Sequence, residues 1–564
     1  MLRNVRMKFF LNPKIEFLIF IVFFFIINLI QSYFTGLLDD EAYYWVWSQQ
    51  LAVGYFDHPP LVALWVKISS LFFHGELGVR FFSILSFLGM LYFIWLTIDT
   101  PKKRQYVWLY FLLIVSVAFL NVYGFVALPD TPLLFFTALF LFAYKRFLET
   151  NSTAFALLLG IASAGMLYSK YHGALLLILI VISNIGLLKN KKFWLAVLVS
   201  VLLLIPYILW QIEHHFMSVR YQLFERSKHL YKLRYTLNYF VDLLVIVGVS
   251  FPIIFWAFFK KKISNQFEKS LQYIVIGFIV FFFFSTFKTS TQAQWNVIVL
   301  IPLVILTFDY FIEHTTARKW LVYLGLTNLF LMLIARVFLL SNSLLPVEFE
   351  THRAKNWAQN IKEKTQGKPI IFINSYQLAS KYNFYTNIKT HSFSILKGRQ
   401  SQYDLSNFEQ EMQGKDVVVI GKEIEGKKFF KQKNKTYFGK YINNYRSLQK
   451  IKCIIDKKRL KVSPDEKAVL QFEIFNPYNF LVSFENVTFV GVFQGKKNAI
   501  IKEIPLVLDT HFSLQPNERK VMNASFKVPE NIKQKGLTFR IGLAYYDLPV
   551  GFQGNKVITT INNE

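Results

Sequence analysis

The 564-residue sequence predicts a polytopic α-helical membrane protein that ends in an α/β segment and a β-sandwich. Hydrophobic residues make up 54% of the chain and charged residues only 17%, whereas the charged residues of a soluble protein approach about a quarter. Apolar segments of membrane-spanning length recur up to residue 341, and short basic clusters separate them. Beyond that point, strand-like patterns bounded by turn residues replace the apolar segments.

We expect about eleven transmembrane helices, because each apolar segment approaches the roughly 20 residues that a spanning helix needs. The first segment, 15–36, follows several basic residues but lacks a small-residue cleavage site. We therefore expect an uncleaved helix and not a signal peptide. The other ten segments lie at 81–99, 106–124, 133–148, 153–169, 173–188, 193–211, 237–259, 270–287, 296–312 and 320–341.

Basic clusters such as Lys102-Lys103-Arg104 and Lys260-Lys261-Lys262 set the orientation of these helices. They all fall on one side if every segment spans, and the positive-inside rule makes that side the cytoplasm. The same pattern accounts for the formal charge of +28 without a nucleic-acid partner. We expect a protein of the inner (cytoplasmic) membrane whose outer side carries 37–80, 125–132, 170–172, 212–236, 288–295 and everything after about residue 342.

An acidic cluster, Asp39-Asp40-Glu41, directly follows the first apolar segment. Acidic residues at the rim of a membrane helix are costly unless they face protein or water, so they indicate a functional site. The simpler interpretation is that they only cap the next helix, since carboxylates favour its first turn. Asp57, His58 and two prolines follow within twenty residues of Glu41, and this density favours the functional interpretation.

Further polar residues fall on the predicted outer side: Arg80, Asp130 and the stretch Lys170-Tyr171-His172. The outer loop 212–236 is an exception to the positive-inside rule, because it holds five cations. Either they contact lipid headgroups, or the loop binds an anionic ligand, since guanidinium groups suit phosphate oxygens. The five are Arg220, Arg226, Lys228, Lys232 and Arg234.

Carboxylates and cations on one face of an apolar bundle suit a reaction in which a carboxylate takes a proton from an acceptor while cations hold an anionic leaving group. A lipid-linked phosphosugar presented from the bilayer is such a donor. Carboxylates also suit Mg²⁺ or Mn²⁺, but cations can neutralise a phosphate without a metal, so metal dependence stays open. Cys453 is the only cysteine, which excludes an intrachain disulfide and a thiolate metal cluster.

Together these stretches resemble the bacterial branch of the dolichyl-phosphate-mannose–protein mannosyltransferase superfamily, glycosyltransferase family 39, and the related aminoarabinose transferases of lipid A. The resemblance covers roughly residues 15 to 345. It implies the membrane fold called GT-C and a polyprenyl-phosphate sugar donor. The stretches that carry it are 39–45, 54–60, Arg80, 129–133, 170–173, 210–215, 218–222 and 294–296, with 374–377 and 402–404 resembling the outer soluble segment of many bacterial members.

The resemblance also implies a role for each matching residue. Asp40 and Glu41 match an Asp-Glu pair whose aspartate is the catalytic carboxylate, and Asp130 matches a second acidic residue in the next outer loop. The aminoarabinose transferases carry a phosphate-binding lysine where this chain has His58, so a phosphate role for His58 requires that other cations compensate for the missing lysine. The candidate substrate-binding residues are Tyr43, Tyr55, Asp57, His58, Arg80, Lys170, Tyr171, His172, Arg220, Arg226 and Trp295.

The region after residue 345 has the composition of a soluble protein. An amphipathic helix at 350–364, buried strands at 369–373 and 416–421, and a short helix at 376–382 predict a small α/β layer. From residue 445 the pattern predicts a β-sandwich. Its strands are expected near 467–475, 485–494, 499–507, 518–527 and 537–546.

We therefore expect three domains: a transmembrane GT-C domain at 1–345, an extracytoplasmic α/β domain at 346–444 and an extracytoplasmic β-sandwich at 445–564. The expected function is inverting transfer of a hexose or pentose from an undecaprenyl or other polyprenyl phosphate to lipid A, a protein or a cell-envelope glycan. The main alternative is a transporter or lipid flippase, which should show ionisable or broken sites near the bilayer midplane. A non-catalytic assembly protein, with the sandwich as its binding module, is a second alternative.

Overall fold

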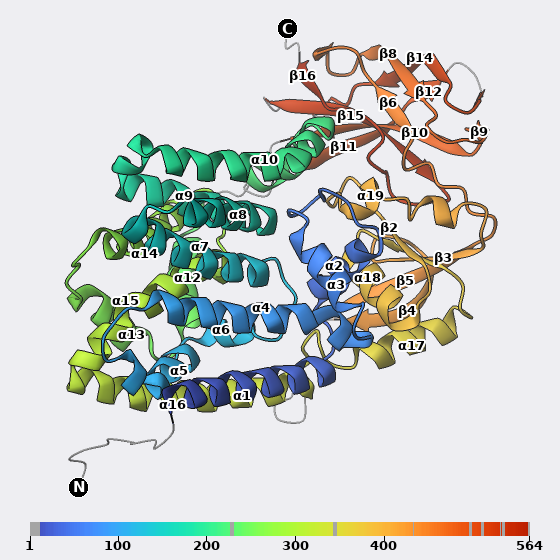
Figure 1. Cartoon of the computed structure of the whole chain (residues 1–564). Coiled ribbons are helices and arrows are strands. Elements are labelled where there is room, and N and C mark those ends of the chain that lie inside the picture. The colour runs from blue at the N-terminus through green and yellow to red at the C-terminus, as the bar shows by residue number, and fades with distance from the viewer. Residues whose placement is uncertain are drawn as a thin grey trace. The chain divides into compact units, whose positions relative to one another are not determined.

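The computed structural model describes residues 12–225, 231–341, 347–432, 434–495, 499–508, 512–530, 532 and 536–561. The chain forms two compact units, Met1–His352 and Arg353–Glu564. The first unit consists of helices and the second contains all the strands that the structure describes (Figure 1).

Seven described helices of the first unit are long and apolar enough to cross a membrane. Its last long helix, α16, lies beside its first, α1 (Figure 1), where Gln31 Nε2 of α1 donates a hydrogen bond of 3.1 Å to Arg336 O of α16. The seven are α1 (Pro13–Phe34), α4 (Gly75–Thr97), α7 (Asp130–Thr150), α10 (Lys191–Glu213), α14 (Gln266–Ser285), the continuous pair of η4 (Ala293–Val299) and α15 (Leu300–Glu313), and α16 (Thr315–Leu340).

The remaining predicted segments are also helical, but each is short or broken. The segment 106–124 divides into α5 (Val107–Val115) and α6 (Ala118–Val122), and 237–259 divides into α12 (Leu233–Val247) and α13 (Phe251–Lys260), which meet at 91°. The polytopic helical fold is thus confirmed, and the count of eleven spans stays a prediction. The short helices and turns are α8 (Thr153–Ser169), α9 (His172–Ser183), η1 (Lys103–Gln105) and η2 (Ile185–Lys189).

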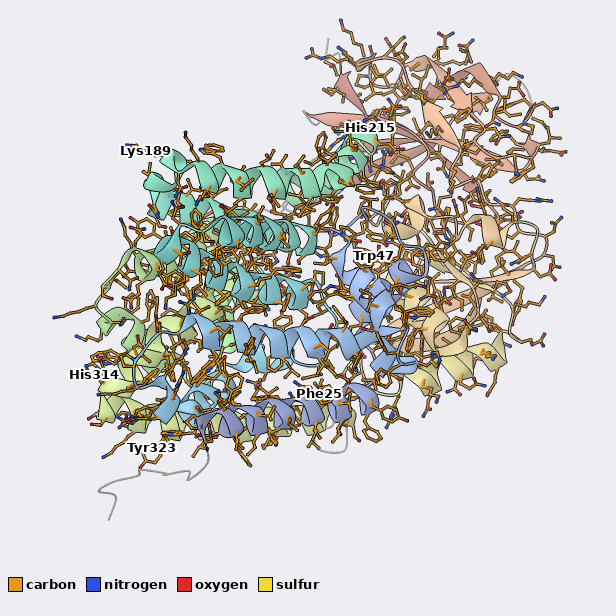
Figure 2. The ribbon with its side chains drawn as sticks, in the orientation of Figure 1. Phe25, Trp47, Lys189, His215, His314 and Tyr323 are labelled. Atoms are coloured by element: carbon orange, nitrogen blue, oxygen red, sulfur yellow. The ribbon has the colours of Figure 1, made fainter. Side chains whose placement is uncertain are left out.

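The two ends of the helical unit carry different residues. Figure 2 labels Lys189 and His314 at one end, and Trp47 and His215 at the other. This separation matches the predicted alternation, in which basic clusters and acidic loops fall on opposite sides. At the Trp47 end, the first predicted outer loop folds into two short helices, α2 (Asp39–Gln49) and α3 (Leu61–Ser69).

The second unit begins with a five-stranded sheet in the order β2-β1-β3-β5-β4. The central strand β1 pairs in parallel with β2 and β3, and β5 and β4 extend the sheet as an antiparallel hairpin. The elements are α17 (Ala354–Lys364), β1 (Ile370–Ile373), α18 (Tyr376–Thr386), β2 (Thr390–Phe393), α19 (Gln402–Leu405), η5 (Gln410–Met412), β3 (Val417–Gly421), β4 (Lys427–Gln432) and β5 (Lys435–Ile442).

Two further sheets form the predicted sandwich: β11-β10-β15-β16-β7 and β12-β14-β8-β6, with a small β13-β9 pair. In the second sheet, β14 and β8 are antiparallel, with Arg519 opposite Phe475 and Lys527 opposite Lys467. The strands are β6 (Lys452–Ile454), β7 (Arg459–Val462), β8 (Lys467–Phe475), β9 (Val482–Ser483), β10 (Val487–Gln494), β11 (Ile500–Pro505), β12 (Val507–Leu508), β13 (Ser513–Leu514), β14 (Arg519–Lys527), β15 (Leu537–Tyr545) and β16 (Val557–Ile561).

One hydrophobic core joins the α/β layer to the sandwich. It contains Ile371 and Val419 from the first sheet together with Phe472 and Ile541 from the sandwich. The predicted boundaries at residues 345 and 444 stay predictions. Asp404, in α19 of the α/β part, accepts hydrogen bonds from Ser394 and Ser401 and from Gln449, which follows β5, and burial raises its pKa to about 6.

The bend between α12 and α13 depends on Gly248. Its backbone has φ 88° and ψ −161°, a region that is essentially restricted to glycine. A Cβ at this position would lie 2.2 Å from Asn328 Oδ1. Asn328 is buried and its Nδ2 donates a hydrogen bond of 2.9 Å to Val115 O, so moving its side chain aside would break this hydrogen bond.

We expect Gly248→Ala to lower the free energy of unfolding by more than about 2 kcal/mol, because backbone strain and overpacking add at this position. Gly75→Ala is the matched control, since Gly75 has φ 65° but nothing within 4 Å of its Cβ position. It should cost only the backbone term of about 1–2 kcal/mol. Thermal unfolding of both variants in detergent measures the difference, and equal losses would contradict the close packing inferred for Gly248.

Candidate active site

The acidic cluster forms the first turn of α2. Leu38 is the N-cap and its backbone N–H donates to Glu41 Oε2 at 2.9 Å, while the N–H of Asp39 donates to Glu350 Oε2 at 2.9 Å. Two carboxylates thus cover the start of the helix: that of Glu41 within the acidic cluster, and that of Glu350 from the segment after α16. Asp40, the second residue of the helix, is half-buried.

Glu41 and Arg80 form a buried ion pair whose side chains are both fully inaccessible to solvent. Arg80 Nε donates to Glu41 Oε1 at 2.7 Å, and its Nη2 pairs with Glu41 Oε2. The same guanidinium donates to the carbonyl oxygens of Ser32, Thr35 and Gly36 at 3.1, 2.6 and 2.9 Å. Such a pair is stable in an apolar interior only because each group also has further hydrogen-bond partners.

This ion pair joins three segments that are distant in sequence. Arg80 comes from α4, the accepting carbonyls belong to the C-terminal end of α1 and the residues after it, and Glu41 comes from α2. Glu41 Oε1 also accepts a hydrogen bond of 2.8 Å from the N–H of Ala127, three residues before Asp130. Glu41 and Arg80 therefore hold the backbone next to Asp40 and the segment just before Asp130.

Asp130 is the first residue of α7, where the helix dipole favours a carboxylate. Its Oδ1 accepts a hydrogen bond of 2.6 Å from Lys170 Nζ, and both side chains are only 5% exposed. Lys170 follows directly after α8, so the pair connects the start of one helix with the end of another. The sequence prediction named both residues, and the structure brings them together.

The segment 54–58 lies against α2 and the end of α10. Tyr43 of α2 donates its hydroxyl to Asp57 Oδ2 at 2.9 Å. The Tyr55 ring stacks on Trp47 at 4.3 Å, and its hydroxyl donates to Trp47 O. Burial raises the pKa of Tyr55 to about 12, so its phenol stays neutral and keeps this donor.

Glycine is required at position 54 because a Cβ there would lie 2.3 Å from the Trp210 ring. Trp210 is near the C-terminal end of α10, so this close approach brings the described start of the basic loop, residues 212–225, to the first outer loop. The loop begins with α11 (Met217–Arg220) and a π-helical turn at Tyr221–Glu225. Arg220 is exposed, and Arg226 lies outside the described residues.

A chain of hydrogen bonds, which the sequence did not predict, joins that loop to the predicted site. Gln211 Nε2 donates to Tyr171 Oη, Tyr207 Oη and Ser218 Oγ at 3.1, 2.7 and 3.0 Å. Ser218 Oγ in turn donates to Tyr55 O at 3.0 Å. Gln222 Nε2 donates to Asp57 O at 2.7 Å. These amide and hydroxyl groups carry no charge, so composition and charge alone could not single them out.

His172 and Trp295 lie together beside Phe282. The His172 ring centroid is 5.4 Å from that of Phe282 and 5.7 Å from that of Trp295. His58 contacts the Tyr44 ring edge-on at 6.3 Å. In the described part of the chain, no group of three or more His, Cys, Asp and Glu side chains is arranged to hold a metal ion.

Comparisons with known proteins match part of this region to a family. Residues 57–210, which include Asp57, Arg80, Asp130 and Lys170, match the family model described as dolichyl-phosphate-mannose-protein mannosyltransferase. The lipid A galacturonosyltransferase RgtD of Rhizobium johnstonii is 25% identical over 311 residues, which is 51% of this chain. The chain spans 61% of the length of that relative. The resemblance noted from the sequence is thus confirmed.

Solved structures show the same fold. The crystal structure of ArnT from Cupriavidus metallidurans in the apo state aligns with a TM-score of 0.55 and 13% identity, over 75% of this chain and 97% of ArnT. The structure of ArnT from the same organism bound to undecaprenyl phosphate aligns with a TM-score of 0.53, again at 13% identity and with the same coverage of both chains. The chain therefore has the GT-C fold of ArnT, with a further β-rich region at its C-terminal end.

We expect Glu41→Gln to lower the free energy of unfolding by about 3–5 kcal/mol, because it leaves the buried charge of Arg80 uncompensated. Glu473→Gln is the matched control: Glu473 pairs with Arg519 at 2.7 Å, but the two side chains are 33% and 60% exposed. Such a surface pair contributes about 0–1 kcal/mol. Thermal unfolding of the full chain distinguishes the two, and an unfolding curve of Glu41→Gln that matches the parent would show that the pair does not hold these segments.

Proposed function

We propose that this chain is an inverting membrane glycosyltransferase that moves a sugar from a polyprenyl phosphate, undecaprenyl phosphate in a bacterium, to a lipid, protein or cell-envelope glycan acceptor. The observation that carries the proposal is a half-buried carboxylate, Asp40, placed by a buried Glu41–Arg80 pair in a chain with the fold of ArnT. The match to the mannosyltransferase model over residues 57–210 and the likeness to a lipid A galacturonosyltransferase support it.

Asp40 is the general base in this mechanism. Its carboxylate takes the proton of the acceptor hydroxyl as the hydroxyl oxygen attacks the anomeric carbon of the sugar. The bond between that carbon and the phosphate oxygen breaks with both electrons passing to the oxygen, and polyprenyl phosphate leaves. Because attack and departure occur on opposite faces of the ring, the anomeric configuration inverts. Asp130, held by Lys170, is the acidic partner residue.

Cations balance the charge of the leaving phosphate. We assign this role to Lys170, His58, Arg220 and Arg226, whereas the guanidinium of Arg80 holds Glu41 and positions the site. Tyr43, Tyr55, Asp57, Tyr171, His172 and Trp295 are assigned to substrate binding, directly or through the loops that they support. Participation of Mg²⁺ or Mn²⁺ stays a proposal, tested by transfer assays with and without a chelator.

We also propose that the site and the second unit face the outer side of the inner membrane. The separation of Lys189 and His314 from Trp47 and His215 supports this orientation. Alkaline phosphatase fused after residue 561 should be active, since that enzyme requires the oxidising environment outside the cytoplasm. A fusion after Lys189 serves as the inactive control. An inactive C-terminal fusion with an active Lys189 fusion would reverse the orientation.

We expect Asp40→Asn to fold like the parent, to bind the polyprenyl donor and to lose transfer by at least about two orders of magnitude, because a general base contributes about 10²–10⁴-fold. Asp39→Asn is the matched control. It changes the adjacent carboxylate and should be much milder. The assay is transfer from a synthetic polyprenyl-phosphate sugar in vesicles, with thermal stability followed in parallel. Near-parental transfer by folded Asp40→Asn would contradict the mechanism and favour the transporter alternative.

A further inference from the structure

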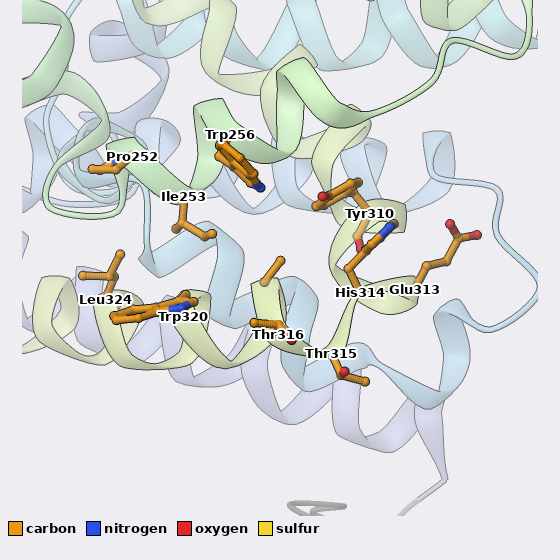
Figure 3. A pocket seen from close by; sticks show the side chains of 11 residues that line it. Pro252, Ile253, Trp256, Tyr310, Glu313, His314, Thr315, Thr316, Trp320 and Leu324 are labelled. Carbon is orange, nitrogen blue, oxygen red and sulfur yellow. The ribbon is translucent and has the colours of Figure 1, made fainter.

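A cavity of about 790 Å³ lies between α13, the end of α15 and the start of α16 (Figure 3). Its lining includes His314, which Figure 2 places at the opposite end of the helical unit from Trp47. The volume falls within the range of about 300–1,000 Å³ that is typical of small-molecule sites. The proposed reaction uses none of the residues that line it, so the cavity is separate from the candidate active site.

Aromatic rings form the walls of this cavity. Figure 3 shows the rings of Trp256 and Trp320 on opposite sides, with Tyr310 and His314 on a third. His314 stacks on Tyr310 with ring centroids 3.9 Å apart. Aromatic faces arranged around a space attract ammonium groups through cation–π interaction. Lys260, which is not among the lining residues, already lies 4.9 Å from the Trp256 ring centroid and shows that this ring accepts a cation.

A carboxylate and a helix N-terminus complete the lining. Glu313 is exposed and forms no ion pair with another described residue. Thr315 and Thr316 begin α16, a helix of 26 residues whose N-cap, His314, makes no side-chain capping hydrogen bond. The N–H groups and dipole of such a helix start favour a phosphate. The cavity thus offers a carboxylate and rings to a cation, and a helix start to an anion.

The cavity is accessible from the predicted lipid–water interface. Trp256 and Trp320 are 55% and 57% exposed. Farther along α16, Tyr323 and Phe330 are also exposed. Tryptophan and tyrosine gather where a membrane helix meets the headgroups. Ile253 and Leu324 provide an apolar wall on the side of the cavity away from Glu313 (Figure 3). A ligand with a zwitterionic head and an apolar tail matches this order of surfaces.

We propose that this cavity binds the headgroup of a zwitterionic phospholipid, with its ammonium against the aromatic rings and its phosphate at the start of α16. Glu313 repels a headgroup that carries only negative charge, and this repulsion opposes the attraction of nearby cations such as Lys260 for anionic phospholipids. The bound lipid joins α13 to α15 and α16, the helices that follow the bend at Gly248. The site is independent of the transfer reaction.

The test is native mass spectrometry of the full chain, released from detergent after incubation with equimolar phosphatidylethanolamine and phosphatidylglycerol. The parent should retain one phosphatidylethanolamine in preference to phosphatidylglycerol. Glu313→Gln and Trp320→Ala should each reduce this retention by roughly threefold to tenfold, the size expected for one charge or cation–π contact. Glu313→Lys should shift the preference to phosphatidylglycerol. Glu313 is exposed, so its variants do not depend on repacking of the core.

Trp194→Ala is the matched control, because Trp194 is 52% exposed on α10, close in sequence to Lys189, and is not among the residues that line the cavity. It should retain phosphatidylethanolamine like the parent. Preference of the parent for phosphatidylglycerol, unchanged retention in Glu313→Gln and Trp320→Ala, or an equal loss in Trp194→Ala would each overturn the proposal. Transfer activity is not the readout, so failure of this site is distinguishable from failure of the proposed reaction.

Discussion

The buried pair of Glu41 and Arg80 is the interaction on which the candidate site depends. A guanidinium inside an apolar bundle is tolerable only when carboxylate and carbonyl oxygens surround it. Here the carbonyl oxygens come from the end of α1 and the residues after it, and the carboxylate comes from the start of α2. The same carboxylate also accepts the N–H of Ala127, in the segment before α7. The cost of burying these charges is offset only in one arrangement of the three segments. The pair therefore specifies where the neighbouring Asp40 and Asp130 lie.

The adjacent acidic residues at the start of α2 have different roles. Asp39, Asp40 and Glu41 are adjacent in sequence, yet a helix turns by about 100° per residue, so adjacent side chains leave in different directions. Glu41 enters the protein interior and is fully buried, whereas Asp40 stays half-buried. One carboxylate is thus used for structure, and its neighbour can be used for chemistry. Asp130 combines both roles, since it starts α7 and pairs with Lys170.

Much of the fold follows from hydrophobic patterns. The apolar segments predicted helices, and the strand predicted at 467–475 matches β8 to the residue. In such long periodic segments, the local pattern of apolar residues determines the secondary structure. The hairpin of β4 and β5 was not predicted, because its segment has the composition of a solvated loop. Its lysines are Lys427, Lys428, Lys431 and Lys435, although lysines are usual on an edge strand. The bend at Gly248 was missed because a single glycine within an apolar segment also fits an unbroken helix.

In the site, charged residues could be named from sequence but their partners could not. Pairing of Asp130 with Lys170 depends on how α7 and α8 pack, and the sequence places the two residues in different loops. Gln211, Ser218 and Gln222 carry ordinary polar side chains, and only the close contact of Gly54 with Trp210 brings them to the first outer loop. Neutral hydrogen-bond networks of this kind have no signature in composition or spacing.

The short segment after α16 has a consequence for where the helical unit ends. His352 Nε2 donates to Phe338 O and Thr351 Oγ1 donates to Leu339 O, which holds the segment against the end of that helix. From there, Glu350 accepts the N–H of Asp39. Residues 349–352 thus follow the last long helix of this unit, yet through Glu350 they complete the hydrogen bonding at the start of α2. Any chimera that exchanges the C-terminal region between relatives must join the two chains after His352, because a junction at the end of α16 would exchange the residue that completes the first turn beside Asp40.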